Sequence, residues 1–342
     1  MSIDETSRKA RQRPTMKDVA AAAAVSLKTV SRVVNDEPGV RPDKQQAVER
    51  AIVALGFSRN YGAAMLRHGQ SSSIGLIVED SAEPFQATLG RAIERVALEH
   101  DSLLFVASSA GTSERERLLV QALASRRVDG LLVVPSNHPH DYLRIEIQSG
   151  VPVVFVDRPV PGIAADTVLT DNVGGAIQAV RHLIDHGHRR IAIIADLPDI
   201  FTANERFEGY QTALRAAGLE YDPSLVFRNA PTDRDSIAEC VVRALDREDP
   251  ATALFTGNSF ITVATLRALK GCSHRPALVG FDDFELADLL TPGISVVAQD
   301  AWSMGTHAAE LLFKRIHGDQ SPTVQIRLAT ALIPRGSGEV GL

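Results

Sequence analysis

From Ile74 onward, short apolar runs alternate with amphipathic segments, and this rhythm constrains the fold more than any other feature of the chain. The apolar runs predict strands at 74–78, 103–107, 130–134, 153–156, 191–195, 253–256 and 277–281. The segments between them predict helices at 85–99, 114–125, 174–186, 206–217 and 261–270. A strand–helix–strand repeat predicts parallel, doubly wound sheets with helices on their faces. Seven or more strands in residues 74–342 predict two lobes.

Polar residues follow several of these strands directly. They are Glu79-Asp80, Ser136, Asp157-Arg158, Asn258 and Asp282-Asp283. Ligands of such sheets bind at the carboxyl ends of the strands. A ring of carboxylate, amide and guanidinium groups suits the hydroxyls of a sugar, which need fixed donors and acceptors. Carboxylates at strand ends also cap the following helices, so each residue taken alone leaves both roles open.

The N-terminal part has a different pattern, that of three short helices. Thr15 and Asp18 have capping-box spacing, which predicts the start of the first helix. Ser26 is expected to cap a second helix that runs to Asn35, and Val30, Val33 and Val34 form its apolar stripe. A third helix is expected after Pro42 and ends at Gly56, with its apolar face on Ala47, Val48, Ala51, Ile52 and Leu55. Two short helices around a tight turn favour a helix-turn-helix, although three packed helices without a DNA role fit the same pattern.

The charge distribution favours a nucleic-acid role for this head. The whole chain has a net charge of −6. Residues 1–70 carry 12 Lys and Arg against 7 Asp and Glu, whereas residues 71–342 carry 24 against 35. A basic head on an acidic body is expected where only the head meets phosphates.

Residues 15–57, TMKDVAAAAAVSLKTVSRVVNDEPGVRPDKQQAVERAIVALGF, closely resemble the head of the lactose-repressor (LacI) family. One departure is Ala24, where the family usually has Gly. The resemblance implies that Ser26 to Asn35 is the recognition helix in the major groove, with Leu27, Lys28 and Arg32 at base edges. The implied DNA-binding residues of the head are Thr15, Ser26, Leu27, Lys28, Thr29, Ser31, Arg32 and Asn35. Phosphate contact and local capping remain open for Thr15, Ser31 and Asn35.

Residues 59–73 resemble the hinge helix and linker of the same family. A helix of about two turns is marginal alone, and the following Gly69-Gln70-Ser71-Ser72-Ser73 is a flexible composition. The resemblance places Asn60, Ala63 and Leu66 at the minor groove, with Leu66 as a wedge that kinks the duplex. Packing of Leu66 against its dimer mate is the alternative.

The family resemblance continues through the body, in stretches such as IGLIVEDSAEPF, VPVVFVDRP and VGFDDFELADLLTPGISVVAQD. It implies the fold of periplasmic sugar-binding proteins. The implied ligand-binding residues are Phe85, Asp157, Arg206, Asn258 and Asp282. Glu79 stands where many relatives have an apolar residue or Pro, which leaves the ligand class open.

Other kinds of site find little support. His182 and His186 have metal-ligand spacing, but no third ligand pattern accompanies them, so we expect no metal. No phosphate-binding glycine motif and no catalytic triad pattern occurs, so we expect neither a cofactor nor an enzyme. The chain has no apolar run of about 18 residues and no secretory signal, which indicates a cytoplasmic location.

The sequence therefore predicts an α/β protein of two-lobed, doubly wound parallel sheets with an N-terminal all-α helix-turn-helix head. The expected organisation is a disordered tail at 1–14, the DNA-binding head at 15–58, the hinge at 59–73 and the ligand-binding and dimerisation domain at 74–342. The expected function is a homodimeric repressor that binds pseudo-palindromic double-stranded operator DNA under the control of a sugar-like effector. A transport-type binding protein and an α/β sugar enzyme are the rivals. The identity of the effector and the direction of its effect stay open.

Overall fold

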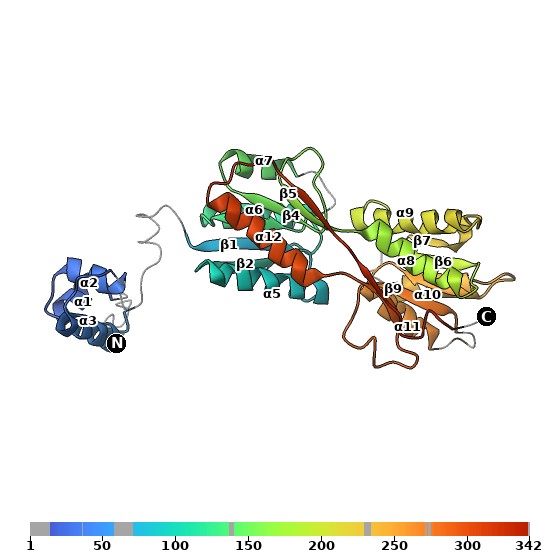
Figure 1. Ribbon diagram of the computed structural model, residues 1–342, viewed down its shortest axis with the longest axis horizontal. Coiled ribbons are helices and arrows are strands. Elements are labelled where there is room, and N and C mark those ends of the chain that lie inside the picture. Colours follow the sequence, from blue (N-terminus) through green and yellow to red (C-terminus); the bar gives the residue numbers. More distant parts are fainter. Residues whose placement is uncertain are drawn as a thin grey trace, which may run out of the picture. The chain divides into compact units, whose positions relative to one another are not determined.

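The computed structural model describes residues 14–35, 37–57, 71–136, 140–228, 234–270, 272 and 275–340. The chain forms two compact units, and the boundary between them falls between Ser71 and Ser72. Figure 1 shows the first unit as a group of helices and the second as two sheets covered by helices. No helix among the described residues is both long and apolar enough to cross a membrane.

The first unit consists of α1 (Met16–Ala22), α2 (Leu27–Val34) and α3 (Pro42–Leu55). Both predicted helix starts are confirmed. The backbone N–H and the hydroxyl of Thr15 donate to Asp18, each at 2.7 Å. The Ser26 hydroxyl accepts from the Thr29 backbone N–H at 3.1 Å. The core contains the buried side chains Val19, Val30, Val48 and Ala51, so the apolar stripe predicted on α2 does face the other helices.

Two details of the head involve the ends of its helices. Ala24, in the turn between α1 and α2, has a φ of 50°, a left-handed conformation that Gly adopts without strain. The expectation that Leu55 belongs to the core face is wrong, because its side chain is exposed. The helix ends at Gly56, whose φ of 62° reverses the chain, and Phe57 packs on the core instead.

The second unit contains two six-stranded sheets, one in each lobe. The sheet of lobe 1 has the order β11-β5-β4-β3-β1-β2 and that of lobe 2 the order β12-β10-β9-β8-β6-β7. The strands of lobe 1 are β1 (Ser73–Val78), β2 (Leu103–Ser108), β3 (Gly130–Val133), β4 (Val153–Val156), β5 (Asp166–Thr170) and β11 (Gln325–Leu328). Those of lobe 2 are β6 (Ile191–Ala195), β7 (Val226–Arg228), β8 (Ala253–Thr256), β9 (Ala277–Phe281), β10 (Ser295–Ala298) and β12 (Ala331–Ile333). The pairs are parallel except β10–β12, so the predicted fold class is confirmed.

Helices cover these sheets (Figure 1). In lobe 1 they are α5 (Pro84–Glu99), α6 (Ser113–Ser125), α7 (Asp141–Gln148) and α12 (Ala301–Ile316). In lobe 2 they are α8 (Asn172–Asp185), α9 (Phe201–Ala216), α10 (Arg234–Leu245), α11 (Ser259–Leu269) and the 3-10 turn η1 (Pro223–Leu225). Each lobe buries its own apolar core on both faces of its sheet.

The seven predicted strands are present, each within one residue of its predicted ends. The structure adds β5, β7, β10, β11 and β12, and it adds α7, α10 and α12. The predicted start of α9 at Arg206 is wrong, since that helix begins at Phe201. Arg206 therefore lies inside the helix rather than at its first turn.

The two lobes repeat one topology, because β4 and β5 occupy in one sheet the places of β9 and β10 in the other. Asp157 directly follows β4 and Asp282 directly follows β9. Both aspartates have a φ of 69°, and the backbone N–H of each donates to the neighbouring strand. Within the described residues the chain crosses between the lobes after β5, after β10 and between β11 and β12.

Candidate functional site

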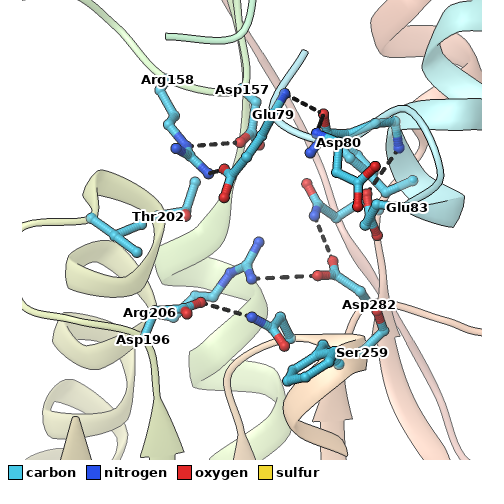
Figure 2. A pocket seen from close by; sticks show the side chains of 16 residues that line it. Glu79, Asp80, Glu83, Asp157, Arg158, Asp196, Thr202, Arg206, Ser259 and Asp282 are labelled. Carbon is cyan, nitrogen blue, oxygen red and sulfur yellow. Dashed lines mark hydrogen bonds and ion pairs between the residues drawn. The ribbon is translucent and has the colours of Figure 1, made fainter. Parts of the chain in front are cut away.

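A cavity of about 340 Å³ is lined by residues of both lobes. Lobe 1 contributes Glu79, Asp80, Glu83, Phe85, Gln86, Asp157 and Arg158, and lobe 2 contributes Asp196, Ile200, Thr202, Arg206, Asn258, Ser259, Phe260 and Asp282, with Gln299 at a crossover. The five residues predicted as ligand-binding, Phe85, Asp157, Arg206, Asn258 and Asp282, are therefore brought together in one place. Figure 2 shows the side chains that line the space, and Asp157, Arg206 and Asp282 are among those labelled.

Lobe 1 presents an arginine that is held by carboxylates. Arg158 donates to Glu79 Oε2 at 2.8 Å and to the Pro135 carbonyl oxygen at 3.3 Å. Its Nε lies 3.4 Å from Asp157 Oδ2. Burial lowers the pKa of Arg158, but Asp157 and Glu79 outweigh this effect and raise it. The guanidinium is therefore charged and its charge is balanced within lobe 1.

Lobe 2 presents an arginine that is held mainly by neutral groups. Arg206 is 5% exposed. It donates to Asn172 Oδ1 at 2.9 Å and to the Gly257 carbonyl oxygen at 2.6 Å. Its guanidinium carbon lies 3.8 Å from the centre of the Phe281 ring, a cation–π contact. Among the described residues, the one carboxylate within 4 Å of it is that of Asp282, at 3.5 Å.

The partners of Arg206 extend to the crossovers between the lobes. Asn172 donates to Glu205 Oε2 at 3.1 Å, and Glu205 also accepts two hydrogen bonds from Arg327 of β11, at 2.8 and 3.1 Å. Glu205 belongs to lobe 2 and Arg327 to lobe 1. The arginine in the cavity is thus linked, through the side chain of Asn172, to an ion pair between the lobes.

Two amides orient further carboxylates of the cavity. Gln299 donates to Asp282 Oδ1 at 2.5 Å and accepts from the Thr170 hydroxyl at 2.5 Å. Asn258 donates to Asp196 Oδ2 at 2.7 Å, while its own carbonyl oxygen caps α11 by accepting from Ile261 N–H. Asn258 thus has the capping role that strand-end residues often have and also lines the cavity.

Burial changes the acidity of several carboxyl groups here. It raises the pKa of Glu83 to about 7, and the neighbouring charges of Asp282 and Asp157 act in the same direction. Burial also raises the pKa of Asp157 and that of Asp196, against the opposing effect of the two arginines. The main cause of each shift is burial, which favours the neutral form of the carboxyl group.

The sequence interpretation missed several of the lining residues. Glu83 and Gln86 lie at the start of α5, where the Glu83 carboxylate caps the helix by accepting from Gln86 N–H at 3.0 Å. Asp196 directly follows β6, so the strand-end rule that found Asp157 and Asp282 would have found it as well. Gln299 follows β10, a strand that was not predicted, and no sequence signal indicated it.

The head presents its predicted base-contacting residues on α2. Leu27 is 46% exposed and Lys28 is also exposed. Arg32 is partly buried, and its Nε lies 3.9 Å from Glu37 Oε2. Contact between Arg32 and a base would therefore replace a long, weak ion pair within the head.

The remaining predicted DNA-binding residues of the head have local partners. The Thr15 hydroxyl bonds to Asp18, Ser26 and Thr29 share a hydroxyl contact of 2.8 Å, and Asn35 donates to the Ser31 hydroxyl at 3.4 Å. Capping thus accounts for these side chains in the absence of DNA. Asn60, Ala63 and Leu66 of the predicted hinge lie outside the described residues.

The histidines with metal spacing have other contacts. His182 Nε2 lies 2.6 Å from Glu339 Oε1, and His186 Nδ1 lies 2.8 Å from the carbonyl oxygen of His182. In the part of the chain that the structure describes, no group of three or more His, Cys, Asp or Glu side chains is placed to hold a metal ion.

Comparison with known proteins finds matches in both parts of the chain. Residues 15–60 match the family described as bacterial regulatory proteins, lacI family, and residues 180–338 match the periplasmic binding protein-like domain. The HTH-type transcriptional regulator CelR of Thermobifida fusca is 36% identical over 339 residues, which cover 96% of this chain and 99% of that protein. The HTH-type transcriptional repressor PurR of Haemophilus influenzae (strain PittGG) is 33% identical over 312 residues, which cover 90% and 92%.

The solved structure of a transcriptional regulator CelR–cellobiose complex has 34% sequence identity and a TM-score of 0.72, and the match covers 95% of this chain and 100% of that chain. A helix-turn-helix head joined to a two-lobed binding body defines a DNA-binding regulator of transcription. The chain belongs to the lacI family of bacterial regulatory proteins.

Proposed function

We propose that this regulator is a repressor whose affinity for operator DNA is set by a small, hydroxylated ligand of the sugar class. The observation that carries the proposal is the cavity itself, since both lobes supply buried donors and acceptors to one space of about 340 Å³. The volume and the polar lining suit a sugar. The CelR complex, a relative of the same fold, contains cellobiose. The relative named PurR is a repressor.

The control is a linkage between the cavity and the head. A ligand that touches both lobes favours one arrangement of them, and the hinge at 59–73 orders on DNA only in the other. A coupling free energy of about 1–3 kcal/mol between the two sites is enough for a useful switch. The cavity has a ligand-binding role and no catalytic one, and the protein acts in the cytoplasm.

Recognition of the operator rests on α2. Arg32 is positioned to fork onto a guanine, Lys28 to donate to a guanine or a phosphate, and Leu27 to pack on a thymine methyl. Thr15, Ser26, Thr29, Ser31 and Asn35 supply phosphate contacts, and Asn60, Ala63 and Leu66 supply the minor-groove contacts of the hinge.

The proposed homodimer is supported by the surface of lobe 1. β2 is an edge strand of its sheet, and it exposes the apolar side chains of Leu103, Phe105 and Val106. Leu98 on the adjacent α5 is exposed as well. Open strand edges with apolar side chains are normally covered. A second copy of the chain is the proposed cover. Phe105→Glu is expected to convert a dimer into a monomer, as measured by light scattering.

The proposal is tested by fluorescence anisotropy of the full chain on DNA from upstream of its own gene, with and without a panel of neutral sugars. Arg32→Ala is expected to weaken specific binding by about 1–3 kcal/mol and to relax base preference at one position per half-site. Arg50→Ala, on the exposed face of α3, is the matched control and is expected to retain the preference. Equal losses on specific and random DNA would make Arg32 a phosphate contact.

Tight sugar binding without any specific DNA binding would favour the transport-type rival, and turnover of a bound sugar would favour the enzyme.

A further inference from the structure

Among the side chains that line the cavity, acidic groups outnumber basic ones. Six of them are carboxylates and two are guanidinium groups, while neither Lys nor His is among the lining residues. The carboxylates are Glu79, Asp80, Glu83, Asp157, Asp196 and Asp282. A neutral sugar needs donors and acceptors but does not need this imbalance of charge. The excess of carboxyl groups therefore points to a ligand group other than a hydroxyl.

The two arginines do not remove the excess. Arg158 is occupied by Glu79 and Asp157 within lobe 1. Arg206 directs two of its hydrogen bonds to neutral oxygens, those of Asn172 and Gly257. Of the six carboxylates, Glu79, Asp157 and Asp282 have an arginine within 4 Å. Among the described residues, Asp80, Glu83 and Asp196 form no ion pair with either arginine.

Three of the carboxylates have acceptor capacity that the protein leaves unused. Asp157 is 7% exposed, and in the described part of the chain its one polar side-chain contact is the 3.4 Å ion pair with Arg158. Glu83 accepts from the Gln86 backbone through one oxygen, at 3.0 Å. Asp282 has Gln299 and, at 3.5 Å, Arg206. A buried carboxylate with so few donors is costly unless a ligand supplies more.

These three groups reach the cavity from different elements. Asp157 follows β4, Asp282 follows β9 and Glu83 precedes α5, and all three line the same space. Figure 2 shows Asp157, Glu83 and Asp282 around the cavity, with Arg206 on the side of lobe 2. The raised pKa of Glu83, about 7, has burial as its main cause and the charges of Asp282 and Asp157 as further causes.

We infer that the effector is an amino sugar, whose protonated amine binds among Glu83, Asp157 and Asp282 while its hydroxyls meet the remaining polar groups. An ammonium group offers three donors and no acceptor, which matches three carboxylates. Sugar acids and sugar phosphates are disfavoured, because their negative charge would meet six carboxyl groups against two guanidinium groups. The inference rests on the proposed control by a sugar-class ligand and narrows that class.

The test is calorimetric titration of the full chain with three β-1,4-linked disaccharides that differ in charge. They are cellobiose, the disaccharide of glucosamine, and glucuronosyl-glucose. The glucosamine disaccharide is expected to bind about ten- to a hundredfold more tightly than cellobiose, since an ion pair forms in a partly desolvated site. Glucuronosyl-glucose is expected not to bind.

Two variants separate a role of charge from a role in folding. Glu83→Gln keeps an oxygen that can cap α5 but removes the charge, and it is expected to abolish the preference for the amine over cellobiose. Glu94→Gln removes a charge from the exposed face of the same helix and is expected to keep the preference. The affinity of the wild type for the amine is expected to rise as the pH is raised towards 7, because Glu83 must release its proton. In Glu83→Gln this rise should be smaller.

Failure of the glucosamine disaccharide to bind, or binding no tighter than that of cellobiose, overturns the inference, and so does binding of glucuronosyl-glucose. If cellobiose or another neutral sugar of the panel still binds and alters DNA affinity, the proposed function stands while the amino sugar is rejected. If no sugar of the panel binds, both are rejected.

Discussion

The two lobes repeat one topology but hold their cavity arginines in opposite ways. In lobe 1, Arg158 comes from the loop after β4, next to Asp157, and carboxylates surround it. In lobe 2, the residue in the matching place after β9 is Asp283, which points instead to Arg335 at 2.7 Å. The arginine of lobe 2 is Arg206, which comes from α9 and is held by amide and carbonyl oxygens.

This difference shows that a repeated backbone does not impose a repeated electrostatic role. The charge of Arg158 is balanced by its own lobe, so we expect it to act as a structural clamp on Asp157 and Glu79. The charge of Arg206 has one carboxylate at 3.5 Å, which leaves it available to orient Asp282 and a ligand. The predictions that follow test this contrast.

The largest expected effect is that of Arg206→Ala. The change leaves the buried oxygens of Asn172 and Gly257 without their donor, and it should lower the free energy of unfolding by about 3 kcal/mol or more. It should also abolish the response to effector. Urea denaturation followed by circular dichroism measures the first effect and titration the second. Arg215→Ala, on an exposed part of the same helix, is the control and should change stability by less than about 0.5 kcal/mol.

Arg158→Met should destabilise by about 1–3 kcal/mol at pH 8, and the loss should depend on pH. Burial raises the pKa of Asp157, and Arg158 opposes this rise. Without Arg158 the folded-state pKa is higher still, so the cost is present when Asp157 is ionised and falls as acid protonates it. The difference in unfolding free energy from the wild type should therefore shrink as the pH is lowered from about 8. An equal pH dependence in Arg206→Ala would remove the contrast between the lobes.

Asp157 and Asp282 should behave alike with respect to backbone conformation, since both have a φ of 69°. Asn tolerates the left-handed region better than Ala. At each position, the Ala variant should therefore be less stable than the Asn variant by about 1 kcal/mol. Thermal unfolding of the four variants without ligand measures this difference. If the Ala and Asn variants differ in stability in only one lobe, the backbone strain at the two aspartates is unequal although their φ angles are the same.

The smallest expected effect is that of the ion pair between the lobes. In a double-mutant cycle, Glu205→Gln and Arg327→Gln should show a coupling of about 0.5 kcal/mol, because Arg327 is partly exposed. Urea denaturation of the single and double variants provides the cycle. A coupling of zero would mean that the Glu205–Arg327 ion pair contributes nothing to stability. Arg206 would then be positioned by residues of lobe 2 alone.

Much of the fold was predictable because its signals are local. The buried strands β1, β4, β6 and β9 are short apolar runs, and their periodicity and length identify them without knowledge of neighbours. β11 could not be predicted in this way, since its sequence QIRL alternates polar and apolar side chains over four residues. β12 has three residues. Such strands form because an existing sheet edge offers them hydrogen-bond partners.

The residues of the candidate site were likewise predictable where their signal is local. The family resemblance named Asp157 and Asp282, and the strand-end rule indicated them independently, because every parallel strand delivers its next residue to the same edge of the sheet. Gln299 had no such signal, since β10 before it was not recognised. For Arg206 the resemblance indicated a role, but nothing in its helix indicated that it would be buried against Phe281.

The sequence by itself determined the α/β class and the three helices of the head, since periodicity, capping and strand ends act over a few residues. The family resemblance carried by the sequence added the helix-turn-helix assignment and five of the side chains that line the cavity. The tertiary structure alone decided how those side chains are charged and held. Arg206 is positioned by Asn172, Gly257 and Asp282, which the fold brings together from far apart in the sequence. The raised pKa of Glu83 likewise reflects burial and the charges of two distant aspartates. Burial and electrostatic potential are sums over neighbours in space, and those neighbours exist only once both lobes have folded.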